Sequence, residues 1–174
     1  MIFLYIVFLL LGFIIVLALA APKKYQVERT IVINKPLAEV FNYIKYIKNQ
    51  DNWSPWKKKD PTMSQEFYGE DGTIGFIASW VGNKEVGEGE QEIKNIIDNS
   101  RLESQLRFLK PWKSESDAYI NVKEIDTDST EVIWGFSGNN KVPMNIMMLF
   151  FNMEKTVGKD FQEGLESLKE LLES

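Results

Sequence analysis

Residues 25–44 read YQVERTIVINKPLAEVFNYI, and the spacing of apolar side chains changes in the middle of this stretch. Up to Ile33 apolar residues alternate with polar ones, with Arg29 as the exception, which predicts a β-strand. Asn34-Lys35-Pro36 then supplies an N-cap residue and an early-turn proline. Apolar residues return at helical spacing at Leu37, Val40, Phe41, Ile44 and Ile47. The stretch therefore predicts a strand that runs directly into a helix.

A period of two continues through residues 64–138. In residues 101–108 the even positions Leu102, Leu106 and Phe108 alternate with charged or polar neighbours, and residues 131–136 behave in the same way. Turn-forming residues separate these runs at 70–72, 82–83, 98–100, 110–111 and 126–129. We therefore expect five or six antiparallel strands joined by short loops.

A long amphipathic helix closes the chain. One apolar stripe follows steps of three and four residues through Met153, Val157, Phe161, Leu165, Leu168 and Leu172. The order of strand, helix, many antiparallel strands and long C-terminal helix predicts an α+β fold. We expect a helix-grip arrangement, in which a curved antiparallel sheet wraps around the C-terminal helix.

Residues 2–21 read IFLYIVFLLLGFIIVLALAA and carry no charge. A helix of this length spans roughly 30 Å, the thickness of a bilayer core. We therefore predict a transmembrane anchor at residues 1–21 and one folded domain at residues 22–174. Ala18-Leu19-Ala20 also fits a signal-peptide cleavage site, but no basic residue precedes the apolar run, and the run exceeds the usual core of about 7–15 residues. A buried core helix is the other alternative, although such a helix rarely lacks a polar face.

The basic residues that follow this segment predict its orientation. Lys23, Lys24 and Arg29 come after the apolar run, and no basic residue comes before it. The positive-inside rule therefore predicts a single-pass membrane protein with a cytoplasmic domain.

Composition excludes several kinds of site. The chain has 20 basic and 25 acidic residues, a net charge of −5, which argues against a nucleic-acid partner and against broad adhesion to anionic lipid. It has no histidine and no cysteine, which removes the usual nucleophile–base systems and the commonest zinc ligands. We expect no metal, no cofactor and no catalytic residue that the sequence alone can identify.

The motifs, taken in order, resemble the SRPBCC or START-like helix-grip superfamily, and most closely its polyketide cyclase/dehydrase branch. The resemblance covers nearly all of residues 22–174 and rests on residues 27–44, Trp53-Ser54-Pro55-Trp56 with Asp60-Pro61, and residues 75–80, 86–93, 132–138 and 158–172. It implies the helix-grip fold. It implies function less strongly, because many members are inferred binders of hydrophobic small molecules and the superfamily has no shared catalytic set.

Glycines on one predicted strand suggest a cavity. Gly87 and Gly89 share the face of residues 86–93 opposite Glu88, Glu90 and Glu92, so they leave a void or permit strand coiling. The alternative is that large side chains, including Trp80, Trp112 and Trp134, fill the space. The predicted pocket residues are Trp56, Phe76, Trp80, Gly87, Gly89, Phe108, Trp134, Phe136, Met147 and Phe151.

Three sets of residues have both a functional and a structural interpretation. Trp53 and Trp56 flank a proline turn and suit a structural plug as well as a pocket rim. The methionine-rich residues 144–151 suit a ligand gate or an ordinary helix start. Arg29 suits an internal ion pair or a contact with a polar ligand head.

The sequence thus predicts a membrane-anchored domain that binds a hydrophobic small molecule or lipid between sheet and C-terminal helix. Its expected partners are the bilayer, through residues 2–21, and this apolar ligand. The alternatives are a cyclase or dehydratase that uses Glu, Asp, Arg or Tyr side chains, and a ligand-free protein-interaction domain with a filled core.

Overall fold

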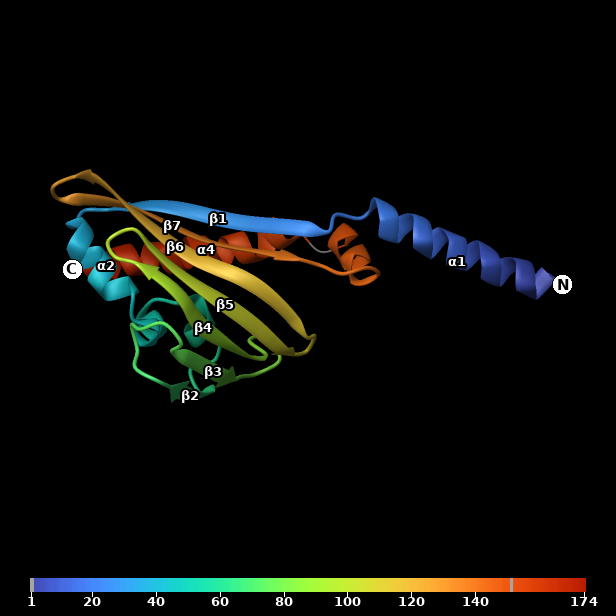
Figure 1. Cartoon of the computed structure of the whole chain (residues 1–174), viewed down its shortest axis with the longest axis horizontal. Helices are drawn as coiled ribbons and strands as arrows, with labels where there is room; N and C mark the ends of the chain where they lie inside the picture. Colours follow the sequence, from blue (N-terminus) through green and yellow to red (C-terminus); the bar gives the residue numbers. More distant parts are fainter. Residues whose placement is uncertain (1, 151) are drawn as a thin grey trace.

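The computed structural model describes residues 2–150 and 152–174, with only the backbone of Met144 (Figure 1). Its seven strands form one antiparallel sheet in the order β1-β7-β6-β5-β4-β3-β2. The predicted α+β helix-grip fold is confirmed. The elements are α1 (Ile2–Ala20), β1 (Lys24–Ile33), α2 (Leu37–Ile44), η1 (Ile47–Asn52), α3 (Pro55–Lys59), β2 (Ser64–Tyr68), β3 (Ile77–Val81), β4 (Glu88–Ile97), β5 (Arg101–Lys110), β6 (Ser114–Asp126), β7 (Ser129–Asn139), η2 (Met144–Leu149) and α4 (Met153–Glu173).

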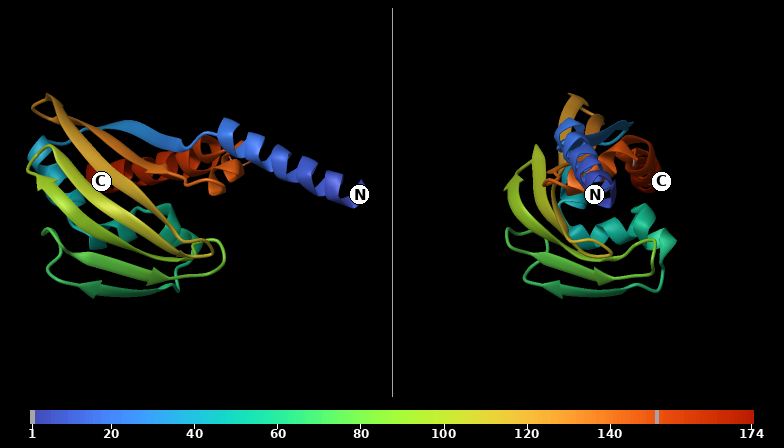
Figure 2. Two further views of the ribbon diagram at one scale, coloured as in Figure 1. Left: turned by 45° about the vertical axis from the view of Figure 1, so that its right-hand side comes forward. Right: turned by 90° about the vertical axis from the view of Figure 1, so that its right-hand side faces the viewer.

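The sheet curves around α4, and the short helices α2, η1 and α3 cover the same concave side (Figures 1 and 2). The main core lies between α4, α2 and strands β1, β6 and β7. Its buried residues include Val27, Phe41, Trp53, Val132, Trp134, Phe161, Leu165 and Leu168. The predicted stripe of the C-terminal helix therefore faces the sheet, because its central residues are buried in this core.

A side-chain cap fixes the start of α4. The Asn152 side-chain oxygen accepts a hydrogen bond from the Lys155 backbone N–H at 2.9 Å. This bond satisfies one of the free donors at the helix N-terminus.

Two buried glycines let α4 approach its neighbours closely. A Cβ at Gly164 would lie 2.7 Å from the Trp134 ring and 3.1 Å from Cδ of Pro55. A Cβ at Gly158 would meet the guanidinium of Arg29. That guanidinium pairs with Glu154 at 2.6 Å, so Arg29 has an ion-pair partner within the chain, although the pair is accessible to solvent and not internal.

The two glycines therefore differ in what an added methyl group would displace. Gly164→Ala is expected to destabilise the domain by about 1–2 kcal/mol, because overpacking against a rigid, buried indole outweighs the helical preference of alanine. Gly158→Ala is the matched control and should leave the melting temperature nearly unchanged, because the end of a half-buried arginine can move and an accessible ion pair contributes little. Thermal unfolding of both full-length variants compares them; equal melting temperatures would contradict the packing at Gly164.

Helix α1 projects from one end of the domain (Figure 1). Its 19 residues are long and apolar enough to cross a bilayer, and nearly all of its side chains are exposed. Asn145 of η2 is fully buried, and its side-chain amide donates hydrogen bonds to the carbonyls of Ala18 at 2.7 Å and Ala21 at 3.0 Å. These bonds satisfy two carbonyls that the end of a helix leaves free, so Asn145 attaches α1 directly to the domain.

Candidate functional site

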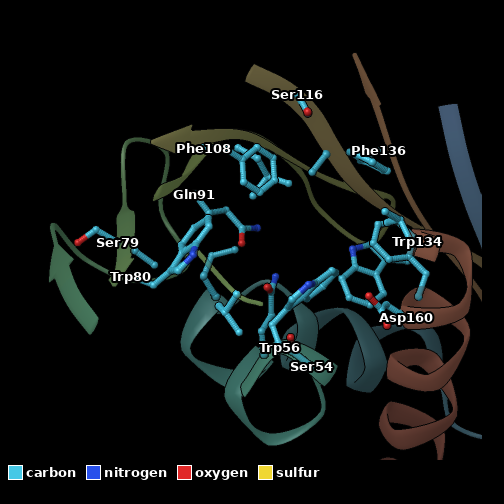
Figure 3. Close-up of a pocket in the computed structure, with 18 of the residues that line it drawn as sticks. Ser54, Trp56, Ser79, Trp80, Gln91, Phe108, Ser116, Trp134, Phe136 and Asp160 are labelled. Atoms are coloured by element: carbon cyan, nitrogen blue, oxygen red, sulfur yellow. The ribbon is translucent and has the colours of Figure 1, made fainter. Parts of the chain in front are cut away.

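A cavity of about 280 Å³ lies between the concave face of the sheet, the short helices and α4 (Figure 3). Its lining comes from distant parts of the chain. Residues from all seven strands form one side, and residues from η1, α3 and α4 form the other. The walls are mainly apolar, as is typical of small-molecule pockets.

Aromatic rings build the wall between helix and sheet. Trp134 of β7 stacks on Phe161 of α4, with ring centroids 4.2 Å apart and planes 7° apart. Trp56 of α3 meets both rings edge-on, at 5.5 Å and 5.9 Å. Phe136 contacts Phe161 at 5.6 Å. This cluster holds α3 and α4 at a fixed separation from the sheet.

Small side chains on the sheet leave the empty space. Ala78 of β3, and Ser116 and Ala118 of β6, line the cavity with short side chains. In the cross-strand register, Ala118 lies opposite Ser104 on one side and Phe136 on the other. The cavity therefore exists where short side chains on the central strands face helices that do not reach them.

The predicted glycines are not the source of the space. Trp80 pairs with Gly89 across the strands and covers it, so a Cβ at Gly89 would lie 2.6 Å from the Trp80 ring. The same Cβ would also lie 2.6 Å from the Arg107 carbonyl oxygen. Gly87 has a φ of +73°, and a Cβ there would lie 2.5 Å from the Lys110 carbonyl oxygen. These glycines serve strand geometry and close packing, and neither of them lines this cavity.

Five of the ten predicted pocket residues line the cavity: Trp56, Trp80, Phe108, Trp134 and Phe136. Phe76 is instead fully buried in a second core cluster with Ile93 and Leu102. Met147 lies in η2 and is exposed. Phe151 lies outside the described residues. The lining residues that sequence reasoning missed are mostly small or polar, including Tyr25, Gln91, Ser116, Ala118 and Asp160.

The remaining tryptophans have different environments. Trp53 is fully buried and packs edge-on against Trp134 at 4.8 Å, which fits the structural-plug alternative. Its indole nitrogen has no hydrogen-bond partner among the described residues. Trp112 is exposed and does not fill the cavity.

Polar groups in the lining bond to protein partners. The Tyr25 hydroxyl and the Ser116 hydroxyl share a hydrogen bond at 2.7 Å, and the Gln91 amide donates to Ser104 at 3.0 Å. Asp160 of α4 pairs with Lys59 at 2.7 Å. Asp51 accepts a hydrogen bond from Gln65 at 2.9 Å. Residues 2–150 and 152–174 contain no cluster of three carboxylate side chains suited to a metal ion.

The acidic face of β4 is paired with basic side chains. Arg107 donates to both Glu90 and Glu92, and Lys110 pairs with Glu88 at 2.7 Å. The hydrogen bond from Arg107 is the main cause that lowers the pKa of Glu92. These glutamates point away from the cavity, as the alternation predicts, and lie in ion pairs on the outer face.

Asp60 connects the end of α3 to the loop before β4. Its carboxylate accepts hydrogen bonds from the Thr62 hydroxyl at 2.9 Å and from the Asn83 backbone N–H at 2.7 Å. These bonds, with the Thr62 hydroxyl first, hold the pKa of Asp60 below its usual value. The carboxylate thereby fixes two segments that border the cavity.

Asp60→Asn should lower the melting temperature at neutral pH. Because the pKa is lower in the folded state, the stabilisation by Asp60 is present above the unfolded pKa of about 3.9 and is lost as pH falls through the folded value. The difference between wild type and variant should therefore shrink toward about pH 3. Melting curves at both pH values test this expectation, and an equal difference at both would contradict it.

Comparison with solved structures supports the fold. A protein from Thermobifida fusca, solved in solution, superposes with a TM-score of 0.62 at 18% identity, covering 84% of this chain and 92% of that protein. Ara h 8.0201 superposes at 0.59 and 11% identity, covering 86% and 97%. DynU16, from the dynemicin biosynthetic locus, superposes at 0.58 and 13% identity, covering 86% of this chain and 47% of DynU16.

No protein-family model matches the sequence, and no curated protein matches it significantly. The structural likenesses, all below 20% identity, therefore concern the fold alone. The chain has a helix-grip fold, preceded by one apolar helix.

Proposed function

We propose that this protein is a membrane-anchored binding protein that holds a hydrophobic small molecule or a lipid acyl chain in the cavity between sheet and α4. One observation carries the proposal: an unfilled space of about 280 Å³, walled mainly by aromatic and aliphatic side chains, within a well-packed domain. This volume is close to the lower end of the roughly 300–1,000 Å³ found for ligand pockets.

The chemistry of the walls favours an apolar occupant. The cavity is partly open to solvent, so a ligand can enter it, and most of its wall is apolar. Burial of apolar surface supplies roughly 25 cal/mol per Å² before the cost of ordering the ligand. The two lining carboxylates, Asp51 and Asp160, have hydrogen-bonding or ion-pair partners within the protein, which supports binding by shape and apolar contact.

The apolar helix α1 is the basis for the proposed membrane location of the protein. We propose that α1 is kept as a transmembrane anchor, that residues 22–174 form the binding domain, and that this domain faces the cytoplasm. Lys23 and Lys24, which directly follow the apolar run, support this orientation. In that setting the bilayer is the nearest source of apolar ligands.

Native mass spectrometry of the full chain, purified in a mild detergent, tests the binding proposal. The expected result is a population with one additional hydrophobic molecule per chain, recovered by solvent extraction and identified by its mass. Lipids that merely surround α1 should dissociate over a range of stoichiometries. A folded chain that carries no such occupant, even after incubation with a lipid extract, would contradict the proposal.

A further inference from the structure

We infer that the end of the domain next to α1 is a bilayer-binding surface that lies in the headgroup layer of the membrane that α1 crosses. This inference rests on the proposed anchoring by α1. The surface, called here the interfacial surface, consists of exposed apolar side chains from the end of β5, from the β5–β6 turn and from residues 142–150. They are Leu109, Trp112, Val142, Met147, Leu149 and Phe150.

The sheet register brings these two segments to one end of the molecule. Lys24 at the start of β1 pairs with Asn139 at the end of β7, and Gly138 pairs with Ser116 near the start of β6. Phe108 pairs with Ser114 across the β5–β6 turn. Trp112 and η2 therefore lie at the end from which α1 emerges, as Figures 1 and 2 show for the turn and for η2.

The Asn145 hydrogen bonds fix η2 against the end of α1. If α1 spans the bilayer, its last residues lie at the membrane boundary, and η2 must lie there too. Phe150 is 83% exposed and Trp112 is 62% exposed, a costly arrangement in water for large apolar side chains. Aromatic and aliphatic side chains at this depth are typical of membrane-interface anchors.

The charges around the interfacial surface fit phospholipid headgroups. Lys23, Lys24, Lys113 and Lys141 are exposed at this end of the domain, and Glu115 is an exposed acidic neighbour. Lysines next to buried apolar side chains can reach lipid phosphates while the apolar groups enter the acyl boundary. The occupant is therefore a phospholipid bilayer, with apolar insertion as the main contribution because the chain as a whole is acidic.

The cavity extends to the same end of the domain. Ser114 lines the cavity, is exposed, and follows Trp112 by two residues. Met153 lines the cavity and follows Phe150 by three residues. Docking of the interfacial surface thus brings part of the cavity lining close to the bilayer, so that an apolar ligand has a short path between membrane and cavity.

Single spin labels on the full chain test the surface directly, because the chain has no cysteine to compete for the label. The labelled variants are Trp112→Cys and Phe150→Cys, with Ile125→Cys as the control. Ile125 is an exposed apolar residue near the β6–β7 turn, at the opposite end of the sheet. Leu10→Cys in the middle of α1 reports whether α1 itself is in lipid.

Each variant is reconstituted in phosphatidylcholine bilayers with and without phosphatidylglycerol. Collision rates are measured with oxygen, which concentrates in lipid, and with a water-soluble nickel complex. We expect the ratio of oxygen to nickel collisions at positions 112 and 150 to exceed the ratio at 125 several-fold, with the highest ratio at position 10.

The outcomes separate this inference from the proposed anchoring. Lipid-like collisions at 10 with water-like collisions at 112 and 150 would overturn the interfacial surface and leave the anchor intact. Water-like collisions at 10 would overturn the anchor and the inference together. Protection of 112 and 150 from both reagents would assign the surface to a second protein copy and would also overturn it.

Discussion

Leu165→Asp is expected to unfold the domain under conditions in which the wild type is fully folded. Leu165 is fully buried on α4, among the residues that join the helix to the sheet. The substitution removes apolar packing worth about 2–5 kcal/mol and places a carboxylate where the described core provides no charged partner. A typical domain has a stability of only about 5–15 kcal/mol.

Tryptophan fluorescence measures this effect without interference from α1, which contains no tryptophan. The emission of buried Trp53 and Trp134 should shift to longer wavelength as they become exposed to water. Leu171→Asp, on an exposed position of the same helix, is the matched control and should keep the wild-type spectrum. A wild-type spectrum and melting temperature for Leu165→Asp would mean that α4 is not docked as described.

Ala118→Leu is expected to abolish ligand retention while the domain stays folded. Ala118 is buried on the cavity face of β6, so the larger side chain would extend into the unfilled space. In native mass spectra the population with one bound hydrophobic molecule should fall at least tenfold. The melting temperature should remain close to that of the wild type, because the added methylenes fill a cavity instead of displacing neighbours.

Val122→Phe on the same strand is the matched control. Val122 is buried in the main core and does not line the cavity. The larger ring should destabilise the domain by about 1–3 kcal/mol, yet its folded fraction should retain the ligand. If Ala118→Leu destabilised the domain as strongly as Val122→Phe and kept its ligand, the space at Ala118 would not be the binding site.

The sequence was sufficient to predict the fold because periodicity reports which side of an element is buried. The stripe of α4 and the alternation in β5 and β7 identified their core faces directly. The change of period near Asn34 correctly separated β1 from α2. These are local signals, and tertiary contacts did not override them.

The position of the cavity could not be predicted from periodicity, because periodicity does not show which side chains lie opposite one another in neighbouring strands. Gly89 suggested an empty inner face, but strand pairing places Trp80 opposite it, and the indole occupies that space. The void instead lies near Ala118, whose importance depends on its neighbours in β5 and β7. Cross-strand register and the reach of α3 decide such details, and neither follows from one strand alone.

Fluorescence quenching by brominated lipid tests directly whether the cavity holds an apolar ligand. Trp112→Phe removes the exposed indole and leaves Trp53, Trp56, Trp80 and Trp134, three of which line the cavity. Bromine quenches an indole efficiently only near contact, so mid-chain brominated phosphatidylcholine around the full-length Trp112→Phe variant reports whether an acyl chain reaches these rings.

We predict that replacing ordinary phosphatidylcholine with the brominated lipid lowers the fluorescence of Trp112→Phe substantially, and that adding Ala118→Leu restores it. Unchanged fluorescence in the brominated bilayer, with the domain folded and competing ligands removed, would show that lipid does not enter. If a library of hydrophobic small molecules then also failed to alter that fluorescence, the claim that the cavity holds an apolar ligand would be contradicted.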